Sequence, residues 1–185
     1  MNRAIKHHAC AALLLGFAAL QIPDSHAAPP SAWDGLRFLE GSWEARTQGG
    51  AANAQGTGSY SFVPELKHHL LVRRSYGAEG CQGPADFDCE HGDVLFVYEE
   101  SGALKAIYFD NEGHVIHYSV TTPDPATAVF VSAPSAAGPQ FQLLYQLKGD
   151  VMSGKFQTRT PGQSQWQSYL EWSGRARPAP IHPKR

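Results

Sequence analysis

Between Gly41 and Gly174, apolar and polar residues alternate in short runs, and each run ends at Gly, Pro, Asn or Asp. A period of two is typical of a β-strand, because successive side chains point to opposite faces of a sheet. The segment 141–147 (FQLLYQL) shows the pattern best, with its Phe, its Tyr and two of its Leu residues on one face. The pattern predicts an all-β protein.

The alternating runs predict about ten strands. They span residues Ser42–Gln48, Gly56–Val63, His69–Tyr76, Asp93–Glu99, Ala103–Asp110, Val115–Thr122, Ala126–Ala133, Gln140–Lys148, Val151–Thr160 and Gln165–Ser173. Several connections are short and contain Gly or Asn, such as 100–102 (ESG) and 111–113 (NEG), and such turns join antiparallel neighbours. Closure of the resulting sheet removes its exposed edges. We therefore expect a single antiparallel up-and-down β-barrel.

The barrel domain is expected to span residues 28–174. Before its first strand, Ser31–Leu39 begins with a capping Ser and carries apolar residues at helical spacing, which predicts a short N-terminal helical plug. After the last strand, residues 175–185 contain several Pro residues that suit no strand, and we expect a disordered tail there.

Residues 1–27 have the three parts of a secretory signal: a basic start, an apolar run at Ala9–Leu20 and small residues at Ser25 and Ala27. The apolar run is shorter than the roughly 20 residues that cross a bilayer. We therefore expect a cleaved signal peptide and an exported protein, periplasmic or secreted, without stable membrane insertion.

The formal net charge of the chain is −2, and it becomes −3 when residues 1–27 are removed. A nearly balanced charge offers no basic surface for a nucleic acid. We expect no nucleic-acid partner, and the oligomeric state is left open.

Two cysteines remain after the expected cleavage, Cys81 and Cys89, in the Gly- and Pro-containing stretch CQGPADFDC. Disulfides form and persist in exported proteins, so we expect these two residues to be bonded. A metal or redox pair is the alternative, although the Cys-x₂-Cys spacing of such sites is missing.

A family resemblance starts at LRFLEGSWEAR (residues 36–46) and continues through GTGSYSFVPELKHHLLVRRSYG, FVYEESGALKAIYFDNEGHVIHYSV and YQLKGDVMSGKFQTRTPGQSQWQSYLEW. These segments resemble calycin-like bacterial β-barrels of unknown function, which are related to nitrobindins and, more distantly, to lipocalins and fatty-acid-binding proteins. The resemblance implies about ten antiparallel strands around a cavity, with Trp43 at the closed end. It implies no settled activity.

Nitrobindins, which share the opening step of this resemblance, carry haem on a histidine late in the barrel. The corresponding strands here, residues 151–173, contain no histidine. We therefore expect no cofactor, and haem is kept as an alternative.

Arg73 and Arg74 are adjacent in a predicted strand, so one of them faces the interior of the barrel. Leu70 and Val72 share the face of Arg74, which makes Arg74 the candidate for the interior. An inward arginine needs a carboxylate, carbonyl groups or an anionic ligand, because an unpaired buried charge is costly. Pairing with an inward acidic side chain is the alternative to a ligand.

The predicted ligand-binding residues are those that would line a hollow barrel. They are Trp43, Arg74, Tyr98, Tyr108, His117 and Tyr145. Aromatic walls with hydroxyl groups suit a small organic guest. Plain packing of these aromatic residues is the alternative.

The sequence contains no nucleophile elbow, zinc-protease motif, phosphate loop or EF-hand loop, so no catalytic or metal-binding residue is assigned. The adjacent His68 and His69 point to opposite faces of a strand. A cross-strand pair such as His69 with His117 is the metal alternative. The acidic stretch from Asp86 to Asp93 is expected to be a solvated loop.

We expect an exported barrel that binds a small, largely apolar molecule without catalysis. This predicts an interior cavity of several hundred Å³ with few polar groups. Three alternatives stay open. One is a haem-binding, nitrobindin-like barrel, one is a cofactor-free isomerase or cyclase with a polar set around Arg74, Tyr108 and His117, and one is a structural or interaction protein of the envelope with a filled barrel.

Overall fold

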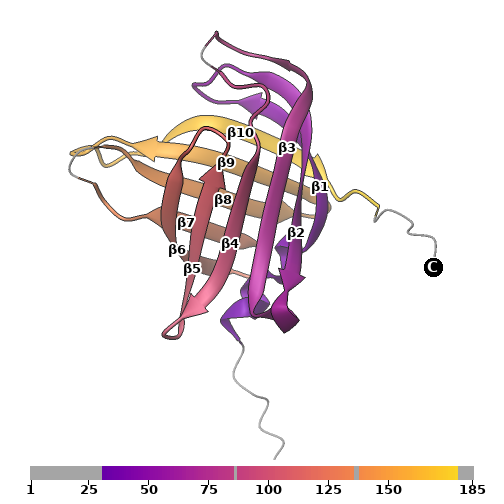
Figure 1. Ribbon diagram of the computed structural model, residues 1–185, viewed down its shortest axis with the longest axis vertical. Coiled ribbons are helices and arrows are strands. Elements are labelled where there is room, and N and C mark those ends of the chain that lie inside the picture. Colours follow the sequence, from indigo (N-terminus) through magenta and orange to yellow (C-terminus); the bar gives the residue numbers. More distant parts are fainter. Residues whose placement is uncertain (1–30, 86, 136–137, 179–185) are drawn as a thin grey trace, which may run out of the picture.

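The computed structural model describes residues 31–85, 87–135 and 138–178, which form a closed antiparallel β-barrel (Figure 1). Its strands, in chain order, are β1 Gly41–Gly49, β2 Gln55–Glu65, β3 Leu70–Gln82, β4 Asp93–Glu100, β5 Ala103–Asp110, β6 Val115–Asp124, β7 Thr127–Ser132, β8 Gln140–Lys148, β9 Val151–Arg159 and β10 Gln167–Arg175. Each strand pairs with the next, and β10 pairs with β1 to close the barrel. The predicted ten-stranded up-and-down barrel is confirmed.

The longest departure from the predicted strand limits is in β3, which continues six residues beyond Tyr76 to Gln82. Its extension stays paired with β2, with Glu79 opposite Thr57 and Gln82 opposite Gln55. Figure 1 shows this pair of strands reaching beyond the rest of the barrel. The predicted disulfide between Cys81 and Cys89 is confirmed, and it joins the end of β3 to the loop that leads to β4.

An aromatic cluster fills one half of the barrel. Its centre is Tyr145, which is fully buried and whose ring centroid lies 5.3 Å from that of Phe62, 5.8 Å from Tyr60, 5.9 Å from Trp172 and 6.1 Å from Phe130. Most of these contacts are edge-to-face, the arrangement that the charge distribution of aromatic rings favours. The inward residues of four strands therefore form one continuous core.

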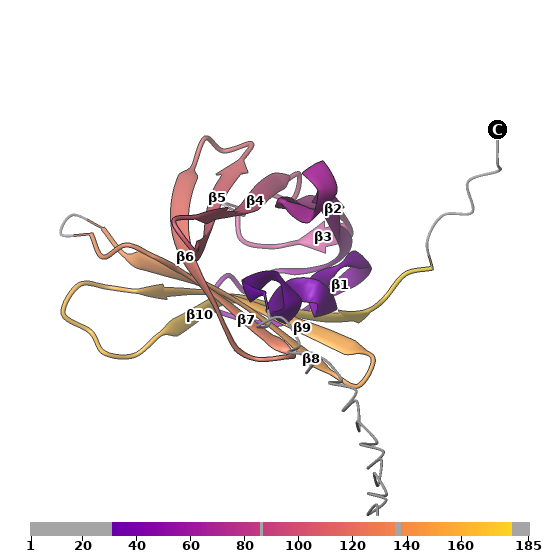
Figure 2. The same cartoon turned by 90° about the horizontal axis from the view of Figure 1, so that it is seen from below.

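The N-terminal segment Ala32–Leu39 is a 3₁₀ helix, η1, which Ser31 and Asp34 begin with a capping box. Leu36 and Leu39 are buried, and the indole Nε1 of Trp43 donates to the carbonyl of Leu39 at 2.8 Å. In Figure 2, the view from below, η1 lies in front of the barrel, at the end that is lowest in Figure 1. The predicted helical segment is thus present only as a short 3₁₀ helix. A second, three-residue 3₁₀ helix, η2 (Leu66–His68), connects β2 to β3.

The C-terminal residues stay attached to the barrel further than expected. β10 ends at Arg175, Ala176 forms a bridge with Trp43, and the amide of Arg177 donates to the carbonyl of Ser42 at 2.7 Å. Residues 175–177 of the expected tail are therefore paired with the barrel. Residues 179–185, like the expected signal peptide at 1–27, lie outside the described residues. No helix in the described part of the chain is long and apolar enough to cross a membrane.

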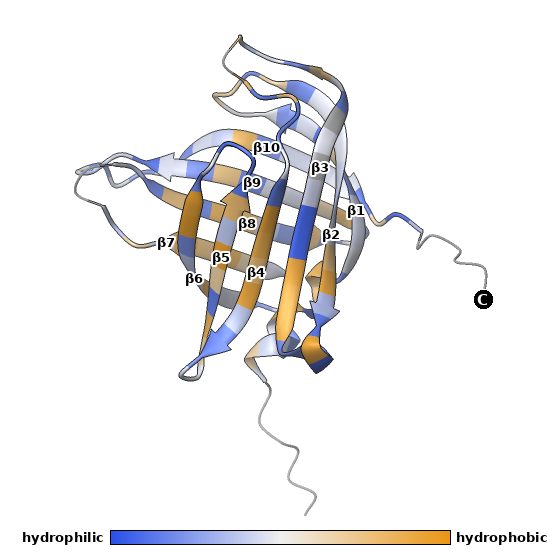
Figure 3. Ribbon diagram, in the orientation of Figure 1, coloured by the Kyte–Doolittle hydropathy of each residue, from blue (hydrophilic) through white to orange (hydrophobic). Residues whose placement is uncertain are grey.

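Figure 3 shows hydrophobic residues along β3 to β5, and some of them lie on the outer face of the barrel. Val72 points outward, opposite Val63 and Phe96, and yet it is only 2% exposed. Val63 and Phe109 are each 41% exposed on the same side of the sheet. Apolar character alone therefore does not tell the inside of this barrel from the outside.

The indole of Trp172 lies so close to the backbone of Gly154 that a Cβ at Gly154 would overlap the ring. A substitution of Gly154 therefore tests this packing. We expect Gly154→Ala to lower the free energy of unfolding by about 1–3 kcal/mol, as overpacking does. Gly49→Ala is the matched control, since nothing lies within 4 Å of its Cβ position, and it should change stability by less than about 0.5 kcal/mol. Urea unfolding followed by tryptophan fluorescence measures both, and equal stabilities would contradict the packing described.

Candidate ligand-binding site

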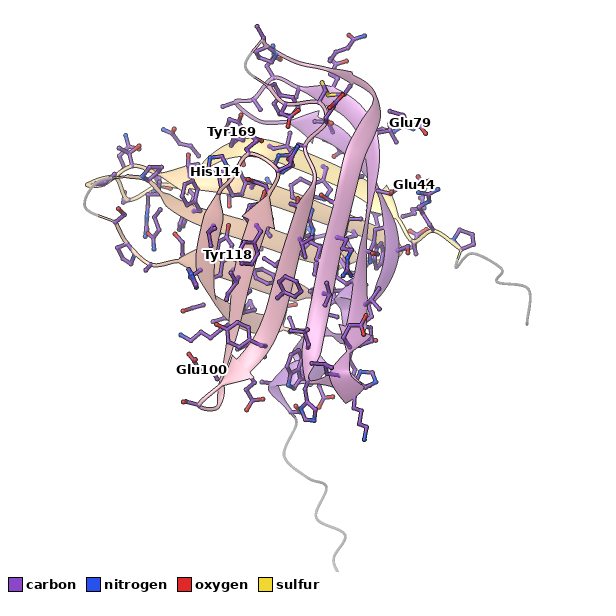
Figure 4. All side chains as sticks on the ribbon, in the orientation of Figure 1. Glu44, Glu79, Glu100, His114, Tyr118 and Tyr169 are labelled. Carbon is purple, nitrogen blue, oxygen red and sulfur yellow. A yellow bond between two sulfur atoms is a disulfide. The ribbon has the colours of Figure 1, made fainter. Side chains whose placement is uncertain are left out.

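A cavity of about 540 Å³ occupies the other half of the barrel interior. Its lining includes residues of the connections 83–92 and 111–114. These connections lie at the end of the barrel opposite η1 in Figure 1, which we call the open end. In Figure 4, His114 and Tyr169 lie at this end, Tyr118 lies deeper, and Glu100 marks the opposite end. The walls of the cavity include Ala45, Tyr60, Arg73, Asp93, Tyr108, Tyr118, Phe141, Leu143, Phe156 and Trp172.

Arg73 and Asp93 form a buried ion pair on one wall of the cavity, at 7% and 8% exposure. Asp93 is opposite Ser75 in the β3–β4 register, and it also accepts a hydrogen bond from the Ser75 hydroxyl at 2.7 Å. Burial opposes the charge of Asp93, but the Arg73 guanidinium together with His91 and Ser75 holds its pKa below the ordinary value. The cation of Arg73 is therefore already neutralised by the protein.

His91 extends this pair to the open end. Its Nδ1 lies 2.7 Å from Oε1 of Glu112, and its Nε2 lies 3.0 Å from the Tyr108 hydroxyl and 3.6 Å from Oδ2 of Asp93. The contact with Asp93, helped by Glu112 and opposed by burial, raises the pKa of His91 to about 9. The imidazolium then donates from both ring nitrogens at neutral pH, and the Tyr108 hydroxyl donates a hydrogen bond to Asp110, 3.2 Å away.

The β5–β6 turn holds this arrangement in place. Asn111 donates to the Asp88 carboxylate and to the carbonyl of Glu90, both at 3.2 Å, and it accepts from the amide of Gly92 at 3.0 Å. Asp110 accepts from the amide of His114 at 2.8 Å. Hydrogen bonds thus join the connection 83–92 to the connection 111–114 at the open end.

Buried polar atoms of another kind lie behind the surface of the cavity and in the core below it. Four buried atoms make no well-aligned hydrogen bond with the residues that the structure describes: the hydroxyls of Tyr60 and Tyr145, Nε of Arg73 and Nε1 of Trp172. Two of them, the Tyr60 hydroxyl and the Trp172 indole, interact with each other. Burial raises the pKa of Tyr60 to about 12, against a smaller opposing effect of Arg73, so this hydroxyl stays neutral. The Arg73 guanidinium also lies 5.4 Å from the centroid of the Tyr60 ring.

The structure sorts the predicted ligand-binding residues into two groups. Trp43, Tyr108 and Tyr145 point into the barrel, but only Tyr108 lines the cavity, because the other two pack below it. Tyr98 and His117 lie on the outer face, opposite Lys105 and Ile107 respectively.

The expectation that Arg74 faces the interior is wrong. Arg74 is exposed and Arg73 is the inward residue, opposite the buried Phe62 of β2 and Leu95 of β4. The preceding residues, Leu70 to Val72, are all apolar, so they do not indicate which face is inside. The neighbouring strands decide it, since paired residues share a face.

The polar set that the enzyme alternative required around Arg74, Tyr108 and His117 is therefore not formed. A different set meets at Tyr108, made of Arg73, His91 and Asp93, and sequence reasoning missed all three as site residues. The one available signal was Asp93, which shares the alternation of the buried Leu95 and Val97 in β4. The cavity is accordingly more polar on this wall than expected.

Asp88, His91 and Glu112 bring possible metal-ligand atoms within 4.8 Å of one another. In this structure the protein already satisfies them. Both nitrogens of His91 are bonded, and Asp88 accepts from the amide of Glu90 at 2.8 Å and from Asn111. We assign no metal to this group.

Comparison with solved structures finds the same fold in the crystal structure of Rv2717c from M. tuberculosis. The TM-score is 0.52 and the sequence identity 16%, and the match covers 83% of this chain and 100% of that chain. No protein-family model and no curated protein matches the sequence. At this identity the likeness shows the barrel fold alone.

Removal of Arg73 should be costly, because it leaves the Asp93 carboxylate buried without its cation. We expect Arg73→Leu to lower the free energy of unfolding by about 3–5 kcal/mol, whereas Arg74→Leu on the exposed face changes it by less than about 0.5 kcal/mol. Adding Asp93→Asn to Arg73→Leu should recover part of the loss, since the unpaired charge is gone. Urea unfolding of the four proteins checks this, and equal effects of the two arginines would contradict the orientation of β3.

The raised pKa of His91 makes stability depend on pH. The groups that face its ring are Asp93, Glu112 and Tyr108, and the carboxylates favour the charged form. The folded-state pKa of about 9 exceeds the unfolded value of 6.5, so the contribution is fully present below 6.5 and is lost as pH rises through about 9.

We therefore expect the free energy of unfolding of the wild-type protein to fall across this pH window. His91→Gln should flatten the fall, and His117→Gln, on the outer face, should keep the wild-type profile. Urea titrations at a series of pH values measure it. An unchanged profile in His91→Gln would show that another group causes the dependence.

Proposed function

We propose that this protein is an exported barrel that binds one small, largely apolar molecule in its interior without catalysis. The observation that carries the proposal is the cavity of about 540 Å³, which is within the range of sites that bury a drug-sized ligand. A barrel whose role is purely structural has no need for such a volume, because packing of its interior to ordinary density would stabilise it further.

The walls of the cavity support an apolar guest. Phe141 and Phe156 stack with ring centroids 5.8 Å apart, and Tyr169 meets Phe156 edge-on at 6.2 Å. Ile116 and Leu170 add aliphatic surface on neighbouring parts of the wall. Flat aromatic and branched aliphatic surfaces bind organic molecules mainly by excluding water.

The polar wall favours binding over the acid–base alternative. His91 is hydrogen-bonded to Glu112 and Tyr108, and Tyr108 donates to Asp110. Each of these groups therefore already has a hydrogen-bond partner within the protein. The histidines that line the cavity, His91 and His114, are likewise held by carboxylates, which does not favour haem ligation.

Three further features fit the proposal. The disulfide between Cys81 and Cys89 suits an oxidising compartment, as export would provide. Burial of Leu36 and Leu39 of η1 supports closure of the barrel at the end opposite the cavity mouth. The closed barrel fold, which Rv2717c shares, gives the cavity a continuous wall.

The proposal predicts saturable binding of one equivalent of N-phenyl-1-naphthylamine, a neutral apolar dye, measured by its fluorescence increase. Ala45→Phe, which places a ring in the cavity, should weaken binding by about tenfold or more. Ala103→Phe makes the same change at an exposed position of β5 outside the cavity, and it should leave the affinity unchanged.

Absence of dye binding, or equal binding by both variants, would contradict an interior site. Native mass spectrometry of protein purified from its own host then identifies the guest, since a bound molecule adds its mass to that of the chain.

A further inference from the structure

We propose that a second copy of this chain docks on the outer face of strands β2 to β5, and that a two-fold axis parallel to these strands relates the two copies. This inference concerns the outside of the barrel, and it does not depend on the guest proposed for the interior.

Apolar side chains gather on the outer face of β2 to β5, where Figure 3 shows hydrophobic residues along β3 to β5. Strand pairing aligns the outward residues of neighbouring strands in rows, and two adjacent rows supply these side chains. We define the apolar patch as Val63, Val72, Phe96, Ile107, Val94 and Phe109. Val63 and Phe109 are each 41% exposed, and the rings of Phe96 and Phe109 meet edge-on at 6.3 Å. Contiguous apolar surface of this kind is typical of an interaction site.

The outer face of β8 and β9 has a different character. Strand pairing sets its central outward residues opposite each other, and most of them are polar: Gln142 and Gln157, Leu144 and Lys155, Gln146 and Ser153. Apolar residues are therefore concentrated on one side of the barrel exterior. Folding of the barrel does not explain this concentration, because the polar side closes equally well.

A third row places opposite charges at the two flanks of the patch. Its members are Glu65 on β2, Leu70 on β3, Tyr98 on β4 and Lys105 on β5. A two-fold axis that runs parallel to the strands between β3 and β4 keeps each row at the same height and exchanges β2 with β5. Glu65 of one copy then lies opposite Lys105 of the other, twice per dimer. Sheets that pack face to face keep their strands within about 30° of each other, so the rows stay opposed near the axis.

Glu65 and Lys105 have no ionic partner of their own. In the part of the chain that the structure describes, neither forms an ion pair, and Nζ of Lys105 contacts only the Ser119 hydroxyl, at 3.4 Å. Three strand spacings, roughly 14 Å, separate β2 from β5, so the two charges do not neutralise each other within one chain. The second copy supplies the partner that each of them lacks.

Arg74 limits the strength of the contact. It is exposed and lies next to the axis in the row of Val94, so the dimer brings two guanidinium groups to the same side of the patch. Long aliphatic stems allow the charged ends to stay in water at the rim. The contact spans four strands and three rows, which is less than a standard interface. We therefore expect a weak dimer, with a dissociation constant of about 10–100 μM.

Sedimentation velocity of the purified protein, from about 1 to about 500 μM, should show a change from monomer to dimer. Ile107→Arg places an unpaired charge in each half of the contact and should weaken association at least about tenfold. Leu144→Arg makes the matched change on the outer face of β8 and should leave association unchanged. Circular dichroism checks that both variants are folded. A monomer throughout the range, or equal loss in both variants, overturns the proposal.

Charge reversal tests the axis. Glu65→Lys and Lys105→Glu each replace two attractive contacts by two repulsive ones, and each should raise the dissociation constant about three- to tenfold. The double variant restores the opposition with the signs exchanged, and it should return to within about twofold of the wild-type value. If the single reversals have no effect, or the double variant does not recover, the two-fold arrangement is overturned even where Ile107→Arg abolishes the dimer.

A lipid surface is the other occupant that an apolar patch could meet, and vesicles of phosphatidylglycerol and phosphatidylethanolamine test it. We expect the protein to stay in the supernatant when the vesicles are sedimented. Co-sedimentation that Ile107→Arg abolishes, together with a monomer in solution, would overturn the second copy and assign the patch to lipid.

Discussion

The ion pair between Arg73 and Asp93 is the interaction on which the open end of the barrel depends. Asp93 is shared by Arg73, Ser75 and His91, and His91 in turn contacts Glu112 and Tyr108. A buried carboxylate is tolerated only when its lone pairs and its charge are satisfied. Each neighbour of Asp93 is thereby fixed in one orientation, and the connections at the open end follow from that orientation.

The barrel interior is divided into two halves with different physical character. Around Tyr145 the inward rings of several strands pack against one another and leave little space. Toward the open end, small inward residues such as Ala45 and Gly58, which are opposite each other on β1 and β2, leave the cavity. The size of the inward-facing side chains along each strand therefore determines which half of the barrel is filled and which is hollow. Charged side chains, among them Arg73, Asp93 and His91, lie on the wall of the hollow half.

The strands were predictable because their signal is local. Alternation in β4, β6 and β8 and the turns between consecutive strands are visible within a few residues, and the sheet order follows from hairpin succession. The orientation of β3 was not predictable, because its apolar run up to Arg73 has no alternation and its outward Val72 is as buried as a core residue. The pairing with Phe62 and Leu95 determines which arginine is inside, and these partners lie on other strands.

Of the residues that the sequence predicted to bind a ligand, only Tyr108 lines the cavity. The polar residues grouped near it, Arg73, His91 and Glu112, come from three separate segments, and no spacing in the sequence relates them. The same limit explains why the cavity is more polar than a pattern of apolar positions indicates: a polar inward residue such as Asp93 becomes acceptable only when its partner from β3 is in place.

By itself, the sequence determined the class of structure, the number and order of the strands and the link between Cys81 and Cys89, because alternation, turn composition and short separations act over neighbouring residues. Only the tertiary structure decided which arginine enters the barrel and which half of the interior stays hollow. These properties depend on pairing and side-chain volume across strands that are far apart in the chain, and closure of the barrel is what brings those strands together.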